Sequence, residues 1–265
     1  MKNKILPALG LLVLINIAMT KAFSKDFIIS EKSGTTTMAV LELYTSEGCS
    51  SCPAAERYLK EIVEQYAGKK QFIPLAFHVD YWDYIGWEDP YSDPKHGLRQ
   101  RDAAQRNQLN SLYTPQFILY GKDFPAFKNI PEAIGIVNNI KPRASIQVET
   151  SLGKPDQLDA SIIISTEDEH VKYYTNVYIA ISENNLSSSI TDGENEGLKL
   201  HHNHVVRQFI GPFTLQGQDK LNIKQNIILD KQWKLADLSL VVFAQDSIDG
   251  TTHQAIQIPL NKLGL

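Results

Sequence analysis

The chain has 265 residues, of which 43% are hydrophobic and 21% are charged. This is the composition of an ordinary globular protein, and it excludes disordered, collagen-like and coiled-coil architectures. The length favours two domains or one large domain.

The first 24 residues have the features of a secretory signal. Lys2 and Lys4 give a positive start, and residues 5–19 form an apolar run that is shorter than the ~20 residues of a membrane-spanning helix. We expect cleavage after Ser24, with an uncleaved anchor as the alternative. Cleavage removes three lysines and lowers the formal net charge from −4 to −7, which argues against nucleic acid as a partner. The sequence thus predicts a secreted protein without stable membrane insertion, and the periplasm is the favoured compartment.

After a lead-in at residues 25–37, the segment 38–142 alternates strand and helix patterns. An aliphatic run at 39–44, an amphipathic pattern that starts at Pro53 and a second apolar run at 72–79 predict a β-α-β unit. Such a crossover is right-handed.

An inserted segment rich in aromatic residues and carboxylates follows at residues 80–110, and its last part, from residue 98, is predicted to be helical. Beyond it we expect a strand at 116–120, a turn, a short strand at 124–127 and a helix at 133–140 that Pro142 ends. The N-terminal order is therefore βαβ, an insertion, then ββα.

Beyond Pro142 the helical patterns disappear, and residues 143–265 are predicted to form an all-β, sandwich-like domain. The expected strands are 145–150, 158–165, 171–182, 198–210, 221–229, 238–244 and 253–260.

Both cysteines of the chain lie in one motif, Cys49-Ser50-Ser51-Cys52, between a predicted strand and a predicted helix. The N-terminus of a helix offers unpaired N–H groups and the positive end of a dipole, which stabilise a thiolate. We therefore expect Cys49 to be an exposed nucleophile and Cys52 to be the resolving thiol that closes the disulfide. Ser50 and Ser51 are small and can donate hydrogen bonds toward sulfur.

The same motif has two other interpretations. A stabilising disulfide is common in exported proteins, but closing a four-residue ring contributes only ~2 kcal/mol, against ~5 kcal/mol for a hundred-residue loop. A structural zinc site needs four ligands, and the sequence has no second C-x-x-C. Redox chemistry is the favoured interpretation, and the structural bridge and the metal site remain alternatives.

Thr114 and Pro115 immediately precede the predicted strand at 116–120. In a βαβ–ββα arrangement we expect the peptide bond between them to be cis and to face the cysteine pair, where backbone groups would pair with an extended substrate. An ordinary trans proline at the start of a strand is the alternative.

This combination of a strand, C-x-x-C at a helix start, and Thr-Pro before a ββα tail resembles the thioredoxin superfamily. More narrowly, the segments LELYTSEGCSSCP (41–53), FHVDYWDYIGW (77–87) and YTPQ (113–116) resemble the secreted thioredoxin-like family filed as domain of unknown function 1223. The segments GEN at 193–195 and HVVR at 204–207 resemble the C-terminal signature of that family.

The superfamily resemblance implies catalytic roles for Cys49, Cys52 and Pro115, with Thr114 beside the proline, and no cofactor. The chain departs from ordinary thioredoxins at two places: Gly48 replaces the usual aromatic residue, and the cysteine pair lacks the Gly-Pro spacer.

Two carboxylates near the motif have alternative interpretations. Glu42, on the strand that leads to the motif, is either a buried proton relay for Cys52 or the partner of a basic side chain. Glu47 is close to Cys49 in sequence, and we expect it to be solvated. Farther along the chain, Glu194 and Arg207 are expected to form an ion pair.

Histidines supply the candidate metal ligands. His78 and His96 could assist the thiols in holding copper or zinc. In a strand, His202 and His204 point the same way and could hold a metal, or they simply form a polar sheet face. The aromatic residues of the insertion, Trp82 among them, form either a core or a groove beside the cysteines.

The sequence therefore predicts an exported thiol–disulfide oxidoreductase or redox sensor that acts on protein thiols or disulfides. One alternative is a metal-delivery protein in which Cys49 and Cys52 hold copper with help from His78 or His96. The other is a non-enzymatic binding module on a thioredoxin scaffold.

Overall fold

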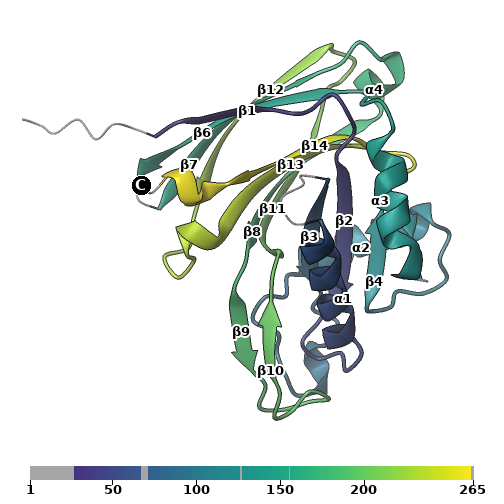
Figure 1. Ribbon diagram of the computed structural model, residues 1–265, viewed down its shortest axis with the longest axis vertical. Coiled ribbons are helices and arrows are strands. Elements are labelled where there is room, and N and C mark those ends of the chain that lie inside the picture. The colour runs from purple at the N-terminus through teal and green to yellow at the C-terminus, as the bar shows by residue number, and fades with distance from the viewer. Residues whose placement is uncertain (1–26, 67–70, 126, 155, 264–265) are drawn as a thin grey trace, which may run out of the picture.

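The computed structural model of the protein describes residues 27–66, 71–125, 127–154 and 156–263 (Figure 1). The predicted signal peptide lies outside these residues. Within them, no helix is both long and apolar enough to cross a membrane.

The predicted β-α-β unit is present. Strand β2 (Ala39–Thr45) leads into helix α1 (Cys52–Gln65), and strand β3 (Phe72–His78) returns parallel to β2. All seven residues of each strand are buried, which explains why both read as continuous apolar runs. Helix α1 turns its apolar stripe toward the sheet and buries Ala55, Leu59 and Ile62.

The insertion contains a short 3₁₀ turn, η1 (Asp83–Ile85), and helix α2 (Pro94–Arg106). Helix α2 begins four residues before the predicted start because the Asp93 carboxylate accepts a hydrogen bond from the backbone N–H of Lys95 (2.8 Å) and caps the helix.

The chain then forms β4 (Gln116–Leu119), β5 (Lys122–Asp123), η2 (Phe127–Asn129) and α3 (Ile130–Asn138). The short strand predicted at 124–127 is wrong, because the turn comes earlier. Tyr120 and Gly121 adopt positive φ angles of 53° and 74°, so the chain reverses there and residues 122–123 pair with β4.

The remaining elements are mostly strands, as predicted. They are β6 (Ser145–Lys154), β7 (Gln157–Ser165), α4 (Glu169–Tyr173), β8 (Thr175–Glu183), β9 (Leu186–Ser189), β10 (Lys199–His202), β11 (Val205–Thr214), β12 (Lys220–Ile228), η3 (Leu235–Asp237), β13 (Leu238–Asp246), β14 (Thr252–Pro259) and η4 (Leu260–Leu263).

Two predicted strands are divided in the structure. The segment 171–182 opens with α4, because the Asp168 carboxylate caps the N–H groups of His170 and Val171. The segment 198–210 breaks between β10 and β11, where His204 has φ 61°. Strands β1 (Ile29–Lys32) and β9 were not predicted.

Within the described part of the chain the strands form three sheets. The largest has eight strands in the order β14-β13-β8-β11-β3-β2-β4-β5, and the others are β1-β6-β7-β12 and the hairpin β9-β10. The eight-stranded sheet takes strands from both sides of Pro142, since β11 lies parallel to β3 at the pair Val205–Ala76. The hairpin extends beyond this sheet alongside α1 (Figure 1).

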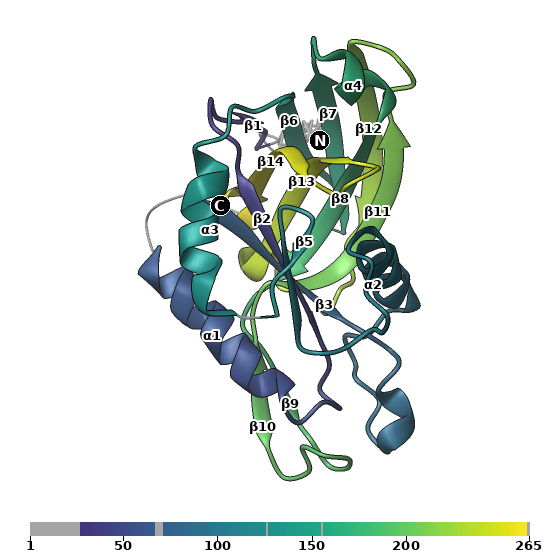
Figure 2. The ribbon, with the colours of Figure 1, turned by 90° about the vertical axis from the view of Figure 1, so that its right-hand side faces the viewer.

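Three apolar cores hold these layers together. One lies between the four-stranded sheet and β8, β13 and β14. The other two lie on opposite faces of the strands β2, β3 and β4, with α1 and α3 on one face and α2 on the other (Figure 2). The loop from β2 to α1 contacts the loop between β9 and β10 through hydrogen bonds from Asn195.

Candidate functional site

Cys49 and Cys52 form a disulfide at the junction of β2 and α1. Cys52 is the first residue of α1, Pro53 follows it, and the first turn of the helix contains no acidic residue. The cysteine pair thus lies at the positive end of the helix dipole, as the sequence predicts.

The expected exposure of Cys49 is wrong for this disulfide form: Cys49 is 1% exposed and Cys52 is fully buried. Trp82 packs closely against the residue that precedes Cys49, since a Cβ atom at Gly48 would lie 3.1 Å from Cβ of Trp82. Ser51 is exposed, and its Oγ lies 3.4 Å from Sγ of Cys49.

The loop between β9 and β10 binds the cysteine loop. The side-chain amide of Asn195 donates hydrogen bonds to the carbonyls of Glu47 (2.7 Å) and Cys49 (3.1 Å). The carboxylate of Glu194 accepts a hydrogen bond from the exposed N–H of Ser50 (3.1 Å). Residues about 145 positions away in the sequence therefore fix the backbone of the C-x-x-C motif.

The expected ion pair between Glu194 and Arg207 is wrong. Arg207 lies 3.4 Å from the carboxylate of Glu183 and over the rings of Tyr91 and Trp233.

The Thr114–Pro115 peptide bond is cis, as expected. It immediately precedes β4, whose first residue, Gln116, pairs with Tyr44 of β2. The hydroxyl of Thr114 accepts a hydrogen bond from Nε1 of Trp82 (2.7 Å), and the same Trp82 packs against Gly48. Trp82 therefore connects the Thr-Pro segment with the cysteine loop.

Glu42 pairs with a basic side chain, which is the second of its two interpretations. Its carboxylate accepts two hydrogen bonds from Arg99 of α2 (2.8 and 2.6 Å) and one from the hydroxyl of Tyr44 (2.7 Å). The guanidinium of Arg99 also lies against four aromatic rings, those of Phe77, Tyr178, Phe209 and Phe243.

Glu47 is fully buried, so the expectation that it is solvated is wrong. Its carboxylate accepts hydrogen bonds from Nε1 of Trp87 (2.7 Å) and from Nε2 of His202 (2.8 Å). Its backbone N–H donates to the Asp89 carboxylate (2.8 Å). These partners satisfy a carboxylate that would otherwise be costly to bury.

His202 lies between two carboxylates. Nε2 contacts Glu47, and Nδ1 contacts Glu56 of α1 (2.6 Å), whose other oxygen accepts a hydrogen bond from the Thr45 hydroxyl (2.9 Å). Burial lowers the pKa of His202, but the hydrogen bonds and charges of Glu47 and Glu56 outweigh it and raise this pKa to about 10. Burial likewise opposes ionisation of Glu56, and His202 overcomes it and lowers the pKa of Glu56.

His78, at the end of β3, has one occupied and one free ring nitrogen. Nδ1 lies 2.7 Å from the Asp89 carboxylate, whereas Nε2 is buried and has no hydrogen-bond partner among the described residues. The rings of His78 and His202 meet edge to face, with centroids 5.0 Å apart.

The other two candidate histidines lie elsewhere. His96 is buried with Nδ1 2.8 Å from the backbone carbonyl of His78 and its ring against Phe77. His204 does not share a face with His202, because the chain turns between β10 and β11, and burial lowers the pKa of His204 to about 4.

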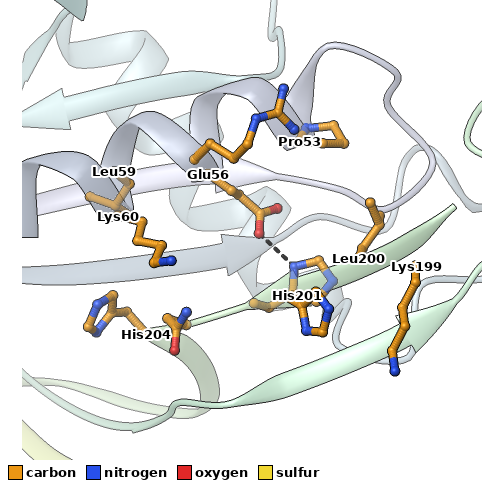
Figure 3. A pocket seen from close by; sticks show the side chains of 11 residues that line it. Pro53, Glu56, Leu59, Lys60, Lys199, Leu200, His201 and His204 are labelled. Carbon is orange, nitrogen blue, oxygen red and sulfur yellow. Dashed lines mark hydrogen bonds and ion pairs between the residues drawn. The ribbon is translucent and has the colours of Figure 1, made fainter.

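A cavity of about 310 Å³ lies between α1 and the β10–β11 segment (Figure 3). Glu56 and His202 are among the residues that line it. It gives the Glu56–His202 pair a route to solvent beside the cysteine motif.

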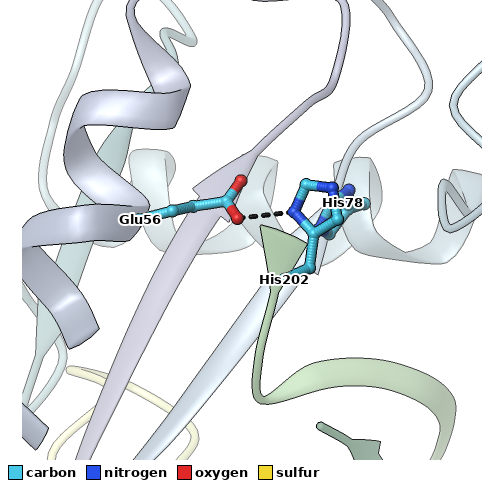
Figure 4. Close-up of side chains that lie close together, drawn as sticks. All are labelled: Glu56, His78 and His202. Carbon is cyan, nitrogen blue, oxygen red and sulfur yellow. Dashed lines mark hydrogen bonds and ion pairs between the residues drawn. The ribbon is translucent and has the colours of Figure 1, made fainter. Parts of the chain in front are cut away.

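Within the described residues, Glu56, His78 and His202 form a group of potential metal ligands (Figure 4). One ligand atom from each lies within 4.8 Å of the other two. The group includes neither cysteine. Sequence reasoning named both histidines but missed Glu56, although its position one helical turn after Cys52 places it near the same end of the sheet.

The fold and this site define a mixed α/β protein with large sheets and a disulfide-linked C-x-x-C motif. The chain belongs to the family described as Protein of unknown function (DUF1223), whose model matches residues 40–245. No curated protein matches the chain.

Two solved structures have a similar fold. Protein AGR_C_4864 from Agrobacterium tumefaciens is 21% identical, with a TM-score of 0.61, over 88% of this chain and 99% of that protein. HBP35 of Porphyromonas gingivalis is 16% identical, with a TM-score of 0.63, over 87% of this chain and 77% of the other. At these identities the likeness concerns the fold alone.

Proposed function

We propose that the chain is an exported, thioredoxin-like thiol–disulfide oxidoreductase that acts on protein thiols or disulfides in the periplasm. The observation that carries this proposal is the Cys49–Cys52 disulfide at the N-terminus of α1, between parallel strands β2 and β3. The antiparallel strands β4 and β5 and helix α3 follow, with Pro115 immediately before β4, and this ββα order supports the proposal.

In the reducing direction, the Cys49 thiolate attacks one sulfur of a substrate disulfide and releases the other as a thiolate. Cys52 then attacks Sγ of Cys49, which restores the Cys49–Cys52 disulfide and releases the second substrate thiol. Two electrons pass from the cysteine pair to the substrate, and the opposite direction reverses each step. Because Cys49 is 1% exposed, this exchange requires a movement of the cysteine loop, whose backbone Asn195 and Glu194 hold, or of the segments around it.

A direct test is the reduction potential of the pair, combined with an insulin-reduction assay. We expect a potential between about −270 and −120 mV, the range of exchanging dithiols. Cys49→Ala should abolish activity, and Cys52→Ala should trap mixed disulfides with partner proteins. Glu61→Gln, at an exposed position of helix α1 outside the motif, is the matched control and should remain active.

A second candidate is a non-enzymatic module in which the disulfide is structural. The 1% exposure of Cys49 favours it. A potential below about −300 mV, together with unchanged assay rates in Cys49→Ala, would establish this candidate and refute the oxidoreductase proposal.

A further inference from the structure

We propose that Glu56, His78 and His202 form a binding site for a first-row divalent metal ion of the zinc type, separate from the cysteine pair. This inference does not depend on the proposed redox function, because none of the three ligands is a sulfur atom. Two imidazoles and one carboxylate form a donor set that suits zinc and its neighbours rather than calcium or magnesium.

The main support is the way in which each imidazole is held. Protein ligands to zinc characteristically use one ring nitrogen for the metal and the other for a hydrogen bond to a carboxylate. Here Asp89 engages Nδ1 of His78 (2.7 Å), and Glu47 engages Nε2 of His202 (2.8 Å). Both imidazoles therefore already have the carboxylate partner that metal-binding histidines usually have.

The two remaining nitrogens are the ones available to a metal. Nε2 of His78 is buried in a fully buried side chain and has no hydrogen-bond partner among the described residues. Nδ1 of His202 contacts the carboxylate of Glu56 (2.6 Å), and a metal ion would replace the proton between them. An orphaned buried nitrogen next to two further donors is an unusual feature that a ligand would explain.

The distances allow a metal with modest movement. One donor atom from each residue lies within 4.8 Å of the other two, whereas donors around a tetrahedral zinc ion lie about 3.3 Å apart. Nδ1 of His202 and the Glu56 carboxylate, now 2.6 Å apart, must therefore separate by about 0.7 Å, and the longest distances must close by at most about 1.5 Å. Glu56 is the ligand that can move, because it alone has a partly exposed side chain, at 12%. Its position on the cavity wall also provides the entry route (Figure 3).

The charge around the site favours a cation. Three buried or nearly buried carboxylates, those of Glu47, Glu56 and Asp89, surround the two imidazoles. The cavity wall also carries Arg57, Lys60 and Lys199. These basic groups oppose cation binding along the cavity wall, but the carboxylates are the charges in direct contact with the two imidazoles.

The test is titration of the metal-free, disulfide-linked protein with Zn²⁺ in competition with a chelator, and with Co²⁺ followed by its visible bands. We expect one ion per chain and at least a ~10-fold weaker affinity in two variants. They are Glu56→Gln, which changes a ligand, and Asp89→Asn, which changes the carboxylate that contacts His78. Glu61→Gln, at an exposed position on the same helix, is the matched control and should bind as tightly as the wild type.

X-ray absorption of the zinc-loaded wild type does not depend on any variant folding. We expect two imidazoles and oxygen around the ion and no sulfur. A stoichiometry near zero, a sulfur-containing shell, or equal affinity in Glu56→Gln and the wild type would each overturn the proposal. Retained binding in a Cys49→Ser, Cys52→Ser double variant would support it, and that result stands even if the oxidoreductase proposal fails.

Discussion

The buried ion pair between Glu42 and Arg99 allows a quantitative prediction. In Arg99→Met the Glu42 carboxylate would keep, among the residues that the structure describes, only the hydroxyl of Tyr44 as a donor, because its two other hydrogen bonds come from Arg99. The side chains of the pair are 4% and 5% exposed, so water cannot replace the lost partner. Removing one member of such a pair costs about 3 to 5 kcal/mol.

That loss should lower Tm by roughly 6 to 20 °C in a chain of this length, and it should lower the urea midpoint without a change in slope. Arg99 also contacts four aromatic rings, and methionine retains part of that packing. Circular dichroism during urea and thermal unfolding is the appropriate assay.

The double variant Glu42→Leu, Arg99→Met removes both charges and should be clearly more stable than Arg99→Met alone. Arg101→Met, at an exposed position of the same helix, should change stability by less than about 0.5 kcal/mol. A loss below about 1 kcal/mol in Arg99→Met, or a double variant less stable than the single one, would refute this account.

Three further predictions concern stability. Burial lowers the pKa of His253 to about 4, so the unfolded chain binds a proton below pH 6.5 that the folded chain binds only below pH 4. Between pH 7 and pH 4, the free energy of unfolding of His253→Gln should therefore fall by up to roughly 3 kcal/mol less than that of the wild type. Equal decreases for the two proteins in urea titrations would contradict this. Gly121→Ala should lower Tm, because the new Cβ would lie 2.4 Å from a backbone carbon and the φ angle of residue 121 is 74°. Gly135→Ala, whose Cβ would enter open space on α3, should raise Tm slightly. Ile179→Ala, fully buried, should cost about 2 to 5 kcal/mol in urea unfolding, against less than about 0.5 kcal/mol for Ile228→Ala at a 61% exposed position.

The sequence predicts the elements that depend on local signals. Strands β2 and β3 are apolar on both faces, and α1 carries an apolar stripe, so periodicity identifies all three. The prediction fails where one residue changes the path of the chain. His204 ends a run that reads as a single strand, and Tyr120 moves a turn by adopting a positive φ that is uncommon for a tyrosine.

The polar network could not be predicted from local patterns, because its members meet only through tertiary structure. Glu47 and His202 are 155 residues apart, and a glutamate in a loop next to a helix start is ordinarily solvated. One signal does exist in the sequence. In β10 the residues alternate in exposure, so His202 shares the buried face with Leu200 while His201 faces solvent. That alternation marks His202 as the inward histidine, but only the fold supplies Glu56 as its neighbour.

The proposed metal site and the cysteine pair are built on one segment of chain, since Glu47 precedes Cys49 by two residues and Glu56 follows Cys52 by four. The side-chain amide of Asn195 donates hydrogen bonds to the backbone carbonyls of both Glu47 and Cys49, and the carboxylate of Glu47 contacts His202, so we expect a movement of the cysteine loop to affect both sites. Any coupling between the two sites must be reciprocal. If zinc shifts the reduction potential by about 30 mV, reduction must change the zinc affinity about tenfold. Equal reduction potentials with and without zinc would mean that the two sites are not coupled, although they lie on one segment of the chain.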